Sequence, residues 1–187
     1  QGNDAWTQLL ETYVHESTDG VNRVDYAALS ASTADRATLD TYIASFEARD
    51  LAGTDDATFA AWTNLYNAVT VRYIAEKYPL DSIRDGFLFG GPWKKVTVMA
   101  GGREVSLDAI EHDILRPRFG DSRVHYAINC ASYGCPNLLT RAWTANTLDA
   151  DLDAAARAYI NHPRGVTVGN RGLTVSSIYK WFEVDFG

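Results

Sequence analysis

One segment, residues 54–79 with the sequence TDDATFAAWTNLYNAVTVRYIAEKYP, constrains the fold more than any other part of the chain. It opens with Thr54 and Asp55, which are typical of a helix N-cap, and it stops at Pro79, which cannot continue a helix. Between these signals, apolar residues fall on almost every side of the predicted helix. A helix with so little polar surface must be covered by other elements. We therefore expect it at the centre of the molecule.

Amphipathic helices are predicted before this segment, and hairpins after it. Apolar residues at helical spacing mark helices at residues 6–14 and 39–46. After the central helix the period changes to two in KKVTVMAGGREVSL (94–107), around a Gly101–Gly102 turn. The same alternation returns in GVTVGNRGLTV (165–175), where the turn falls at Asn170 and Arg171.

The region between the two hairpins mixes helices with one predicted strand. Ser106 is a predicted cap for a helix over 106–115, and RVHYAIN (123–129) alternates as a strand does. Further helices are expected from Pro136, over 147–161, and as a short piece over 176–186. These elements predict an α+β fold, mainly helical with a small antiparallel sheet, in a single domain spanning residues 1–187.

Composition excludes several classes of function. The formal net charge of −7 opposes binding to nucleic acid or to anionic lipid. No apolar run reaches 18 residues, so no membrane span is predicted, and QGNDAW at the N-terminus does not resemble a signal peptide. A chain that starts at Gln1 rather than Met is typical of a processed protein, and we expect a periplasmic or secreted location. The sequence does not indicate the oligomeric state.

Both cysteines lie in one stretch, HYAINCASYGCPNLL (125–139), beside a histidine. If 123–129 is a strand, His125 and Asn129 point to the same side of it. If Pro136 opens a helix, Cys135 lies at its N-terminus, where free N–H groups and the helix dipole lower the pKa of a thiol. Cys135 is then the predicted nucleophile, and His125 is its predicted base.

Other readings of the same stretch stay open. Cys130 is five residues from Cys135, a spacing that permits a disulfide across the loop, and an oxidised pair supplies no free nucleophile. The two sulfurs could also form a redox pair, or a structural bridge in a non-catalytic binding module. A metal site could draw on both cysteines with His112 and His125, but HExxH and paired CxxC spacings are absent, and we predict no cofactor.

Several polar residues stand in apolar surroundings and are further candidates for the site. Asn67, on the central helix, and Glu111 are the predicted partners that orient the imidazole of His125. Glu111 and His112 are adjacent on a helix and point about 100° apart, so at most one of them should face a given site closely. The predicted substrate-binding residues are Asn129, His112 and Tyr66.

The order and spacing of four motifs resemble the family of proteins of unknown function called DUF547. The motifs are FAAWTNLYNAVT, VTVMAGGREVSLDAIEHDILR, VHYAINCASYGCPNL and SSIYKWFEVDFG, and the resemblance runs from Tyr26 to Gly187. It implies a site made of Asn67, Glu111, His112, His125, Asn129, Cys130 and Cys135.

The family is distantly similar to papain-like cysteine hydrolases and transglutaminases, which is an analogy of fold. Because His125 precedes both cysteines, a papain-like fold would have to be circularly permuted. The function we expect is a cysteine-dependent hydrolase or acyltransferase that acts on an amide, ester or peptide, with a small molecule or a peptide as its substrate. The alternatives are a redox or soft-metal protein and a binding module with a structural disulfide.

Overall fold

The computed structural model describes residues 2–79 and 91–187. Its centre is helix α4 (Asp56–Lys77), which begins where the Asp55 carboxylate accepts a hydrogen bond from the Thr58 N–H and ends shortly before Pro79. Residues on every side of α4 are buried, among them Trp62, Leu65 and Val69. The predicted central helix is therefore confirmed.

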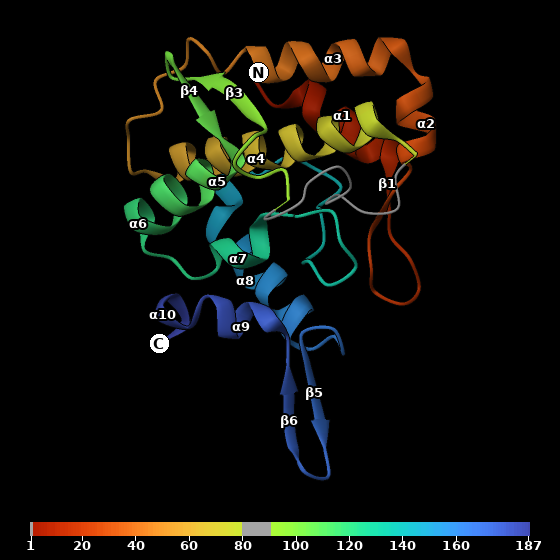
Figure 1. The fold of residues 1–187 in the computed structure, drawn as a ribbon, viewed down its shortest axis with the longest axis vertical. Helices are drawn as coiled ribbons and strands as arrows, with labels where there is room; N and C mark the ends of the chain where they lie inside the picture. The colour runs from red at the N-terminus through yellow and green to blue at the C-terminus, as the bar shows by residue number, and fades with distance from the viewer. Residues whose placement is uncertain (1, 80–90) are drawn as a thin grey trace.

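The N-terminal helices form a layer over one side of α4 (Figure 1). They are α1 (Asp4–Tyr13), α2 (Tyr26–Ala31) and α3 (Thr33–Ala44). Between α1 and α2, the short strands β1 (Val14–His15) and β2 (Arg23–Val24) pair antiparallel, a pairing that the sequence did not indicate. Buried residues such as Trp6, Leu39 and Phe46 join this layer to the central helix in one hydrophobic core.

The second half of the chain covers the remaining sides of α4. Its helices are α5 (Leu107–Ala109), the π-helix η1 (Ile110–Leu115), α6 (Arg116–Phe119), α7 (Val124–Ala127), the 3-10 turn η2 (Ala145–Thr147), α8 (Leu148–Ile160), α9 (Ser177–Trp181) and α10 (Glu183–Phe186). The predicted cap is present, because the Ser106 hydroxyl accepts a hydrogen bond from the Ala109 N–H. The helices expected over 147–161 and 176–186 are also confirmed, the latter as two short pieces.

Both predicted hairpins form. In the first, β3 (Thr97–Ala100) pairs with β4 (Arg103–Ser106), and in the second, β5 (Val166–Gly169) pairs with β6 (Gly172–Val175). The mainly helical α+β class is thus confirmed, with the described strands in separate two-stranded antiparallel sheets rather than one small sheet. The first hairpin lies against the body, whereas the second projects away from it (Figure 1). In the described residues, no helix has the length and apolar character needed to cross a membrane.

Two local predictions are wrong, and both concern the cysteine stretch. Residues 123–129 are not a strand: Val124–Ala127 form helix α7, which is preceded by a turn in which the Asp121 carboxylate accepts a hydrogen bond from the Arg123 N–H. No helix starts at Pro136 either, and residues 136–144 are irregular. Their backbone groups bond to side chains from distant parts of the chain instead; the Asn64 amide, for example, bonds both the N–H and the C=O of Trp143.

Candidate active site

A cavity of about 350 Å³ lies between the central helix, the η1 segment, the cysteine loop and the C-terminal helices. Most of the residues predicted for the site line this cavity: Tyr66, Glu111, His112, His125, Cys130 and Cys135. Aromatic side chains of Trp93, Trp181 and Phe182 complete much of its wall. The structure therefore assembles most of the predicted site in one place, although the local structure expected around the cysteines was wrong.

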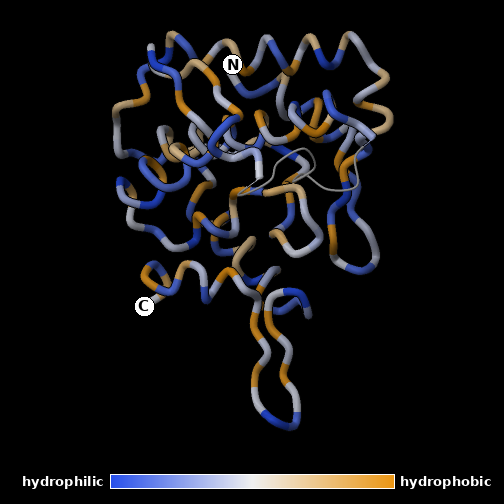
Figure 2. The backbone as a smooth tube through the Cα atoms, viewed as in Figure 1, coloured by the Kyte–Doolittle hydropathy of each residue, from blue (hydrophilic) through white to orange (hydrophobic). Residues whose placement is uncertain are grey.

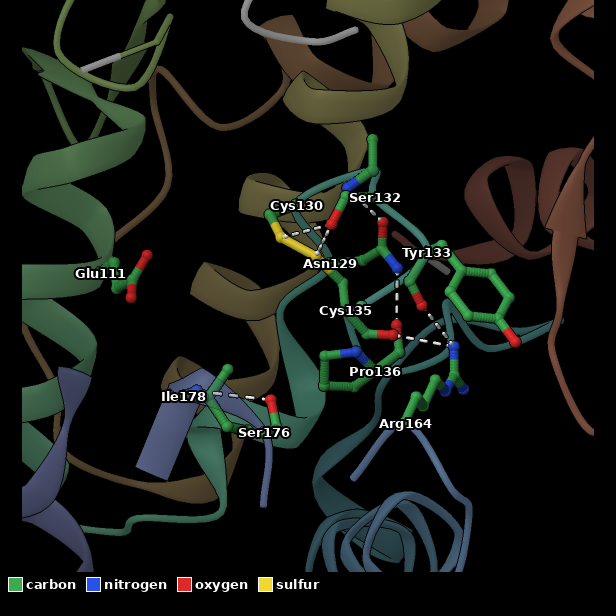
Figure 3. The surroundings of a disulfide bond; sticks show 12 residues. Glu111, Asn129, Cys130, Ser132, Tyr133, Cys135, Pro136, Arg164, Ser176 and Ile178 are labelled. Atoms are coloured by element: carbon green, nitrogen blue, oxygen red, sulfur yellow. Dashed lines mark hydrogen bonds between the residues drawn. A yellow bond between two sulfur atoms is a disulfide. The ribbon is translucent and has the colours of Figure 1, made fainter. Parts of the chain in front are cut away.

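Cys130 and Cys135 form a disulfide across their loop, with their Cα atoms 6.0 Å apart (Figure 3). Cys135 is 4% exposed, whereas Cys130 is only partly buried. The Ser132 hydroxyl lies 3.1 Å from the Cys135 sulfur and can donate a hydrogen bond to it. Because no helix begins at Pro136, the helix dipole that was expected to favour a thiolate at Cys135 is absent, and the preference for Cys135 as nucleophile loses its basis.

Two asparagines hold the cysteine loop in shape and do not line the cavity. The Asn67 side chain donates a hydrogen bond to the Ala127 carbonyl (2.9 Å) and accepts one from the Asn129 N–H (2.8 Å). The Asn129 side chain in turn donates to the Pro136 carbonyl (2.6 Å) and accepts from the Ala131 N–H. Asn129 is thus turned into its own loop (Figure 3) and does not share a space with His125 as a strand would require.

Arg164 supports the loop from the other side, as Figure 3 shows. Its guanidinium donates to the Cys135 carbonyl (2.9 Å) and to the side-chain oxygen of Asn137 (2.6 Å). Burial lowers the pKa of Arg164, but the side chain remains a cation at neutral pH. The segment that carries the disulfide is therefore fixed from both sides by charged or amide groups.

His125 pairs with Asp185, a residue that the sequence reasoning missed. The His125 Nε2 atom lies 2.7 Å from a carboxylate oxygen of Asp185, and the other carboxylate oxygen accepts a hydrogen bond from Arg116 (3.1 Å). The His125 ring stacks on Phe182, with ring centroids 4.0 Å apart, and the residue is 4% exposed. Sixty residues separate His125 from Asp185, and no local pattern marks the carboxylate as its partner.

The electrostatics of this pair favour a neutral imidazole beside an ionised carboxylate. Hydrogen bonding to Arg116 lowers the pKa of Asp185. Burial lowers the pKa of His125, and the bond to Asp185 offsets part of that effect. With Asp185 ionised, neutral His125 carries its proton on Nε2, which leaves Nδ1 free to accept a proton.

Glu111 and His112 both line the cavity, although adjacent residues on a helix were expected to point about 100° apart. They lie on η1, a π-helical turn, where the backbone is wound more widely than in an α-helix. Glu111 is 8% exposed and accepts a long hydrogen bond of 3.4 Å from the Tyr66 hydroxyl. Burial raises the pKa of Glu111. His112 instead accepts a hydrogen bond on Nδ1 from Arg116 (2.8 Å).

One interpretation of the sequence is a metal site that combines the histidines with both cysteines. Across residues 2–79 and 91–187, no group of three or more His, Cys, Asp or Glu side chains is arranged to hold a metal ion. With both sulfurs in the disulfide, the thiolates that such a site needs are not formed.

Comparison with known proteins identifies the family. The family described as "Protein of unknown function, DUF547" matches residues 51–160, more than half of the chain. The chain belongs to the DUF547 family. No curated protein and no solved structure matches it, so the analogy with papain-like folds gains no support. The match is narrower than the resemblance seen in the sequence, which ran on to Gly187.

The extent of the DUF547 match separates the site into two parts. Every predicted site residue, from Tyr66 to Cys135, falls inside the matched range. Three residues fall beyond that range: Asp185, which pairs with His125, and Trp181 and Phe182, whose rings line the cavity. The cavity of this DUF547 chain is therefore completed by a C-terminal segment outside the matched range.

Proposed function

We propose that the cavity is the active site of a cysteine-dependent hydrolase or acyltransferase that acts on an amide, ester or peptide. The observation that carries this proposal is a buried carboxyl group and a buried imidazole that line the same cavity. Burial favours the protonated acid at Glu111 and the neutral base at His125. Titratable groups with shifted pKa values in one cavity are typical of an enzyme active site.

In this mechanism His125 is the general base. Asp185 holds the proton on Nε2, and Nδ1 accepts the thiol proton of the nucleophile. The thiolate attacks the substrate carbonyl, and the leaving amine or alcohol takes the proton back from His125. Water or a second amine or alcohol then resolves the thioester. Glu111, whose pKa burial raises, donates a hydrogen bond from its protonated form to oxygen during the reaction, a role that disulfide exchange would not need.

The nucleophile is available only after the disulfide is reduced. Two external thiols, or one dithiol, deliver two electrons and two protons to the Cys130–Cys135 pair and are oxidised to a disulfide. We assign Cys130 as the nucleophile, because it is the more exposed sulfur and a carbonyl carbon can approach it. Closing so short a loop contributes about 2 kcal/mol to stability, so the reduced domain should remain folded.

The lining of the cavity favours a substrate with an apolar or aromatic group beside the reacting carbonyl. Trp93, Trp181 and Phe182 offer flat apolar surfaces, and Ile128 and Ile178 add aliphatic ones. Periplasmic or secreted location is part of the same proposal, since disulfides persist in oxidising compartments.

A second candidate function is thiol–disulfide exchange with a partner. The bonded sulfurs and their unequal exposure favour it: Cys130 could be attacked from solvent while buried Cys135 acts as the resolving thiol. Exchange needs both cysteines, whereas acyl transfer needs one. A Cys135→Ser variant therefore separates the two functions.

The deciding experiment measures hydrolysis of a panel of 4-nitrophenyl esters and peptide anilides with aliphatic or aromatic acyl groups. We expect wild type to be active only with reductant, Cys135→Ser to be active without it, and Cys130→Ser to be inactive. Activity of neither variant, together with reduction of a model disulfide by wild type alone, would favour exchange. Loss of stability in both variants with no activity of either kind would leave a binding module.

The role of His125 is tested by the pH dependence of iodoacetamide labelling at Cys130 in reduced protein, read by peptide mass spectrometry. A thiol paired with a base labels well below its ordinary pKa of about 8.5. His125→Gln should move the labelling midpoint upward, whereas His15→Gln, a change at an exposed histidine, should leave it in place. An unchanged midpoint in His125→Gln would contradict the proposed base.

A further inference from the structure

The second hairpin carries an apolar face that the described part of the chain leaves uncovered. Its register places Val168 opposite Leu173 and Val166 opposite Val175, so these four side chains share one face. Val168 is 80% exposed, Leu173 67% and Val175 50%. Figure 2 shows hydrophobic residues, in orange, at intervals along both strands of the projecting hairpin. Thr167 and Thr174 form a pair on the opposite face.

This hairpin is anchored firmly at its base only. The Ser176 N–H donates to the Gly165 carbonyl (2.7 Å), and the hydroxyl of buried Tyr159 donates to the Ser176 hydroxyl (2.8 Å). Beyond these bonds both strands extend away from the body (Figure 1). A two-stranded hairpin alone in water is only marginally stable. A partner that covers the apolar face would stabilise it.

Charge distinguishes the candidates for that partner. We define the arm as the hairpin itself, residues 165–175; it contains the cation Arg171 and no acidic residue. Arg171 is exposed and forms no ion pair within the described residues. The whole chain carries −7 and the arm +1, so the rest of the chain carries −8. The body is thus a surface of opposite charge to the arm, and it would repel an anionic membrane.

We propose that the arm docks on the acidic body of a second copy of this chain. Two copies related by a twofold axis can each place an arm on the other, which covers both apolar faces in one closed dimer. Packing the two arms against each other would bring like charges together, so arm-to-body contact is the arrangement that charge favours. This inference is independent of the proposed chemistry.

Sedimentation equilibrium of the full chain tests the proposal. We expect a dimer whose dissociation constant rises at least about tenfold in Leu173→Asn and less than about threefold in Thr174→Asn, the matched change on the opposite face. Raising the salt concentration should weaken the dimer, because opposite charges attract across the contact. Circular dichroism establishes that both variants remain folded.

Three results would overturn the proposal. The first is a wild-type chain that stays monomeric at every concentration measured. The second is a dimer that strengthens with salt and whose dissociation constant does not change in Leu173→Asn, which would mean that the contact lies elsewhere on the chain. The third is a monomer that co-sediments with vesicles of anionic phospholipid and loses this binding in Leu173→Asn, which would make the arm a membrane anchor.

Discussion

The two hairpins β3–β4 and β5–β6 are nearly identical as local structures. Each has four-residue antiparallel strands that pair in a simple register. Each was predicted from alternating residues around a turn, at Gly101–Gly102 in the first and Asn170–Arg171 in the second. The alternation of apolar residues therefore predicted the strand pairing equally well in both hairpins.

Their surroundings are opposite. In the first hairpin Ala100 and Val105 are 0% and 4% exposed, and the Gly101 N–H donates to the Phe46 carbonyl. In the second, most side chains of both strands are exposed. A local pattern specifies which residues share a face, but what covers that face depends on segments far away in the sequence. Matched substitutions in the two hairpins test this difference.

The largest difference is expected for a charge placed on the inner face of each hairpin. Val105→Asp should lower the free energy of unfolding by about 4 kcal/mol, because it buries a carboxylate without a partner. Val168→Asp should change it by less than about 0.5 kcal/mol in the monomer. Urea unfolding measures both values. Equal losses would mean that the second hairpin is covered in the monomer.

A smaller effect is expected at Asp185, where the segment following the second hairpin regains contact with the body. Asp185→Asn should cost about 1–2 kcal/mol at pH 7, since Arg116 and His125 lose a charged partner. The pKa of Asp185 is lowered in the fold, so this contribution is present above the ordinary carboxyl pKa and is lost as pH falls through the folded value. Urea titrations at pH 7 and at acidic pH measure the change.

The same variant should also lower the pKa of His125 further, because Asp185 opposes the effect of burial. The control is Asp108→Asn, which removes a carboxylate 3.9 Å from His112 and should leave the pKa of His125 unchanged. NMR titration of the imidazole protons follows both histidines. A His125 pKa that rises in Asp185→Asn would contradict the pairing.

The smallest effects on stability are expected for glycine substitutions, one in each hairpin. The first should destabilise the protein, and the second should not. Gly101 has φ of +57°, a left-handed conformation, and Gly101→Ala should cost about 1 kcal/mol. Gly169 lies in a strand without a positive φ, and a Cβ there would meet only the Gly172 carbonyl at 3.7 Å. Gly169→Ala should be neutral or stabilise by up to about 0.5 kcal/mol. Thermal unfolding of both variants measures the difference. Equal shifts of the two unfolding midpoints would contradict the prediction.

The main elements of the fold could be predicted because their signals are local. The central helix α4 has its cap, its apolar residues and its stop within one segment, and both hairpins contain their own turns. Helix α7 was missed because alternation over so few residues cannot distinguish a strand from a helical turn. The helix expected at Pro136 was wrong because side chains such as Asn64 bond the backbone of that region, and no local pattern reports such partners.

The residues of the candidate site also divide into those that the sequence could indicate and those that it could not. Residue types that are unusual in apolar segments indicated Glu111, His125 and the cysteines, and these do line one cavity. Asn67 was also selected, but it supports the loop rather than lining the cavity. Asp185 could not be found, since a carboxylate near the end of the chain looks like any surface residue until the fold brings it to His125.

The π-helical turn at Ile110–Leu115 has a consequence for how the length of the chain can change. A π-turn contains one residue more than an α-turn, so deleting one residue there would bring the segment closer to α-helical winding, while Pro117 in α6 would still lack an N–H for the carbonyl four residues before it. The residues beyond the deletion would rotate by about 100° around the axis. The set of side chains from this segment that face the cavity would change as a result. At this point the insertion or deletion of a single residue exchanges the side chains that line the cavity.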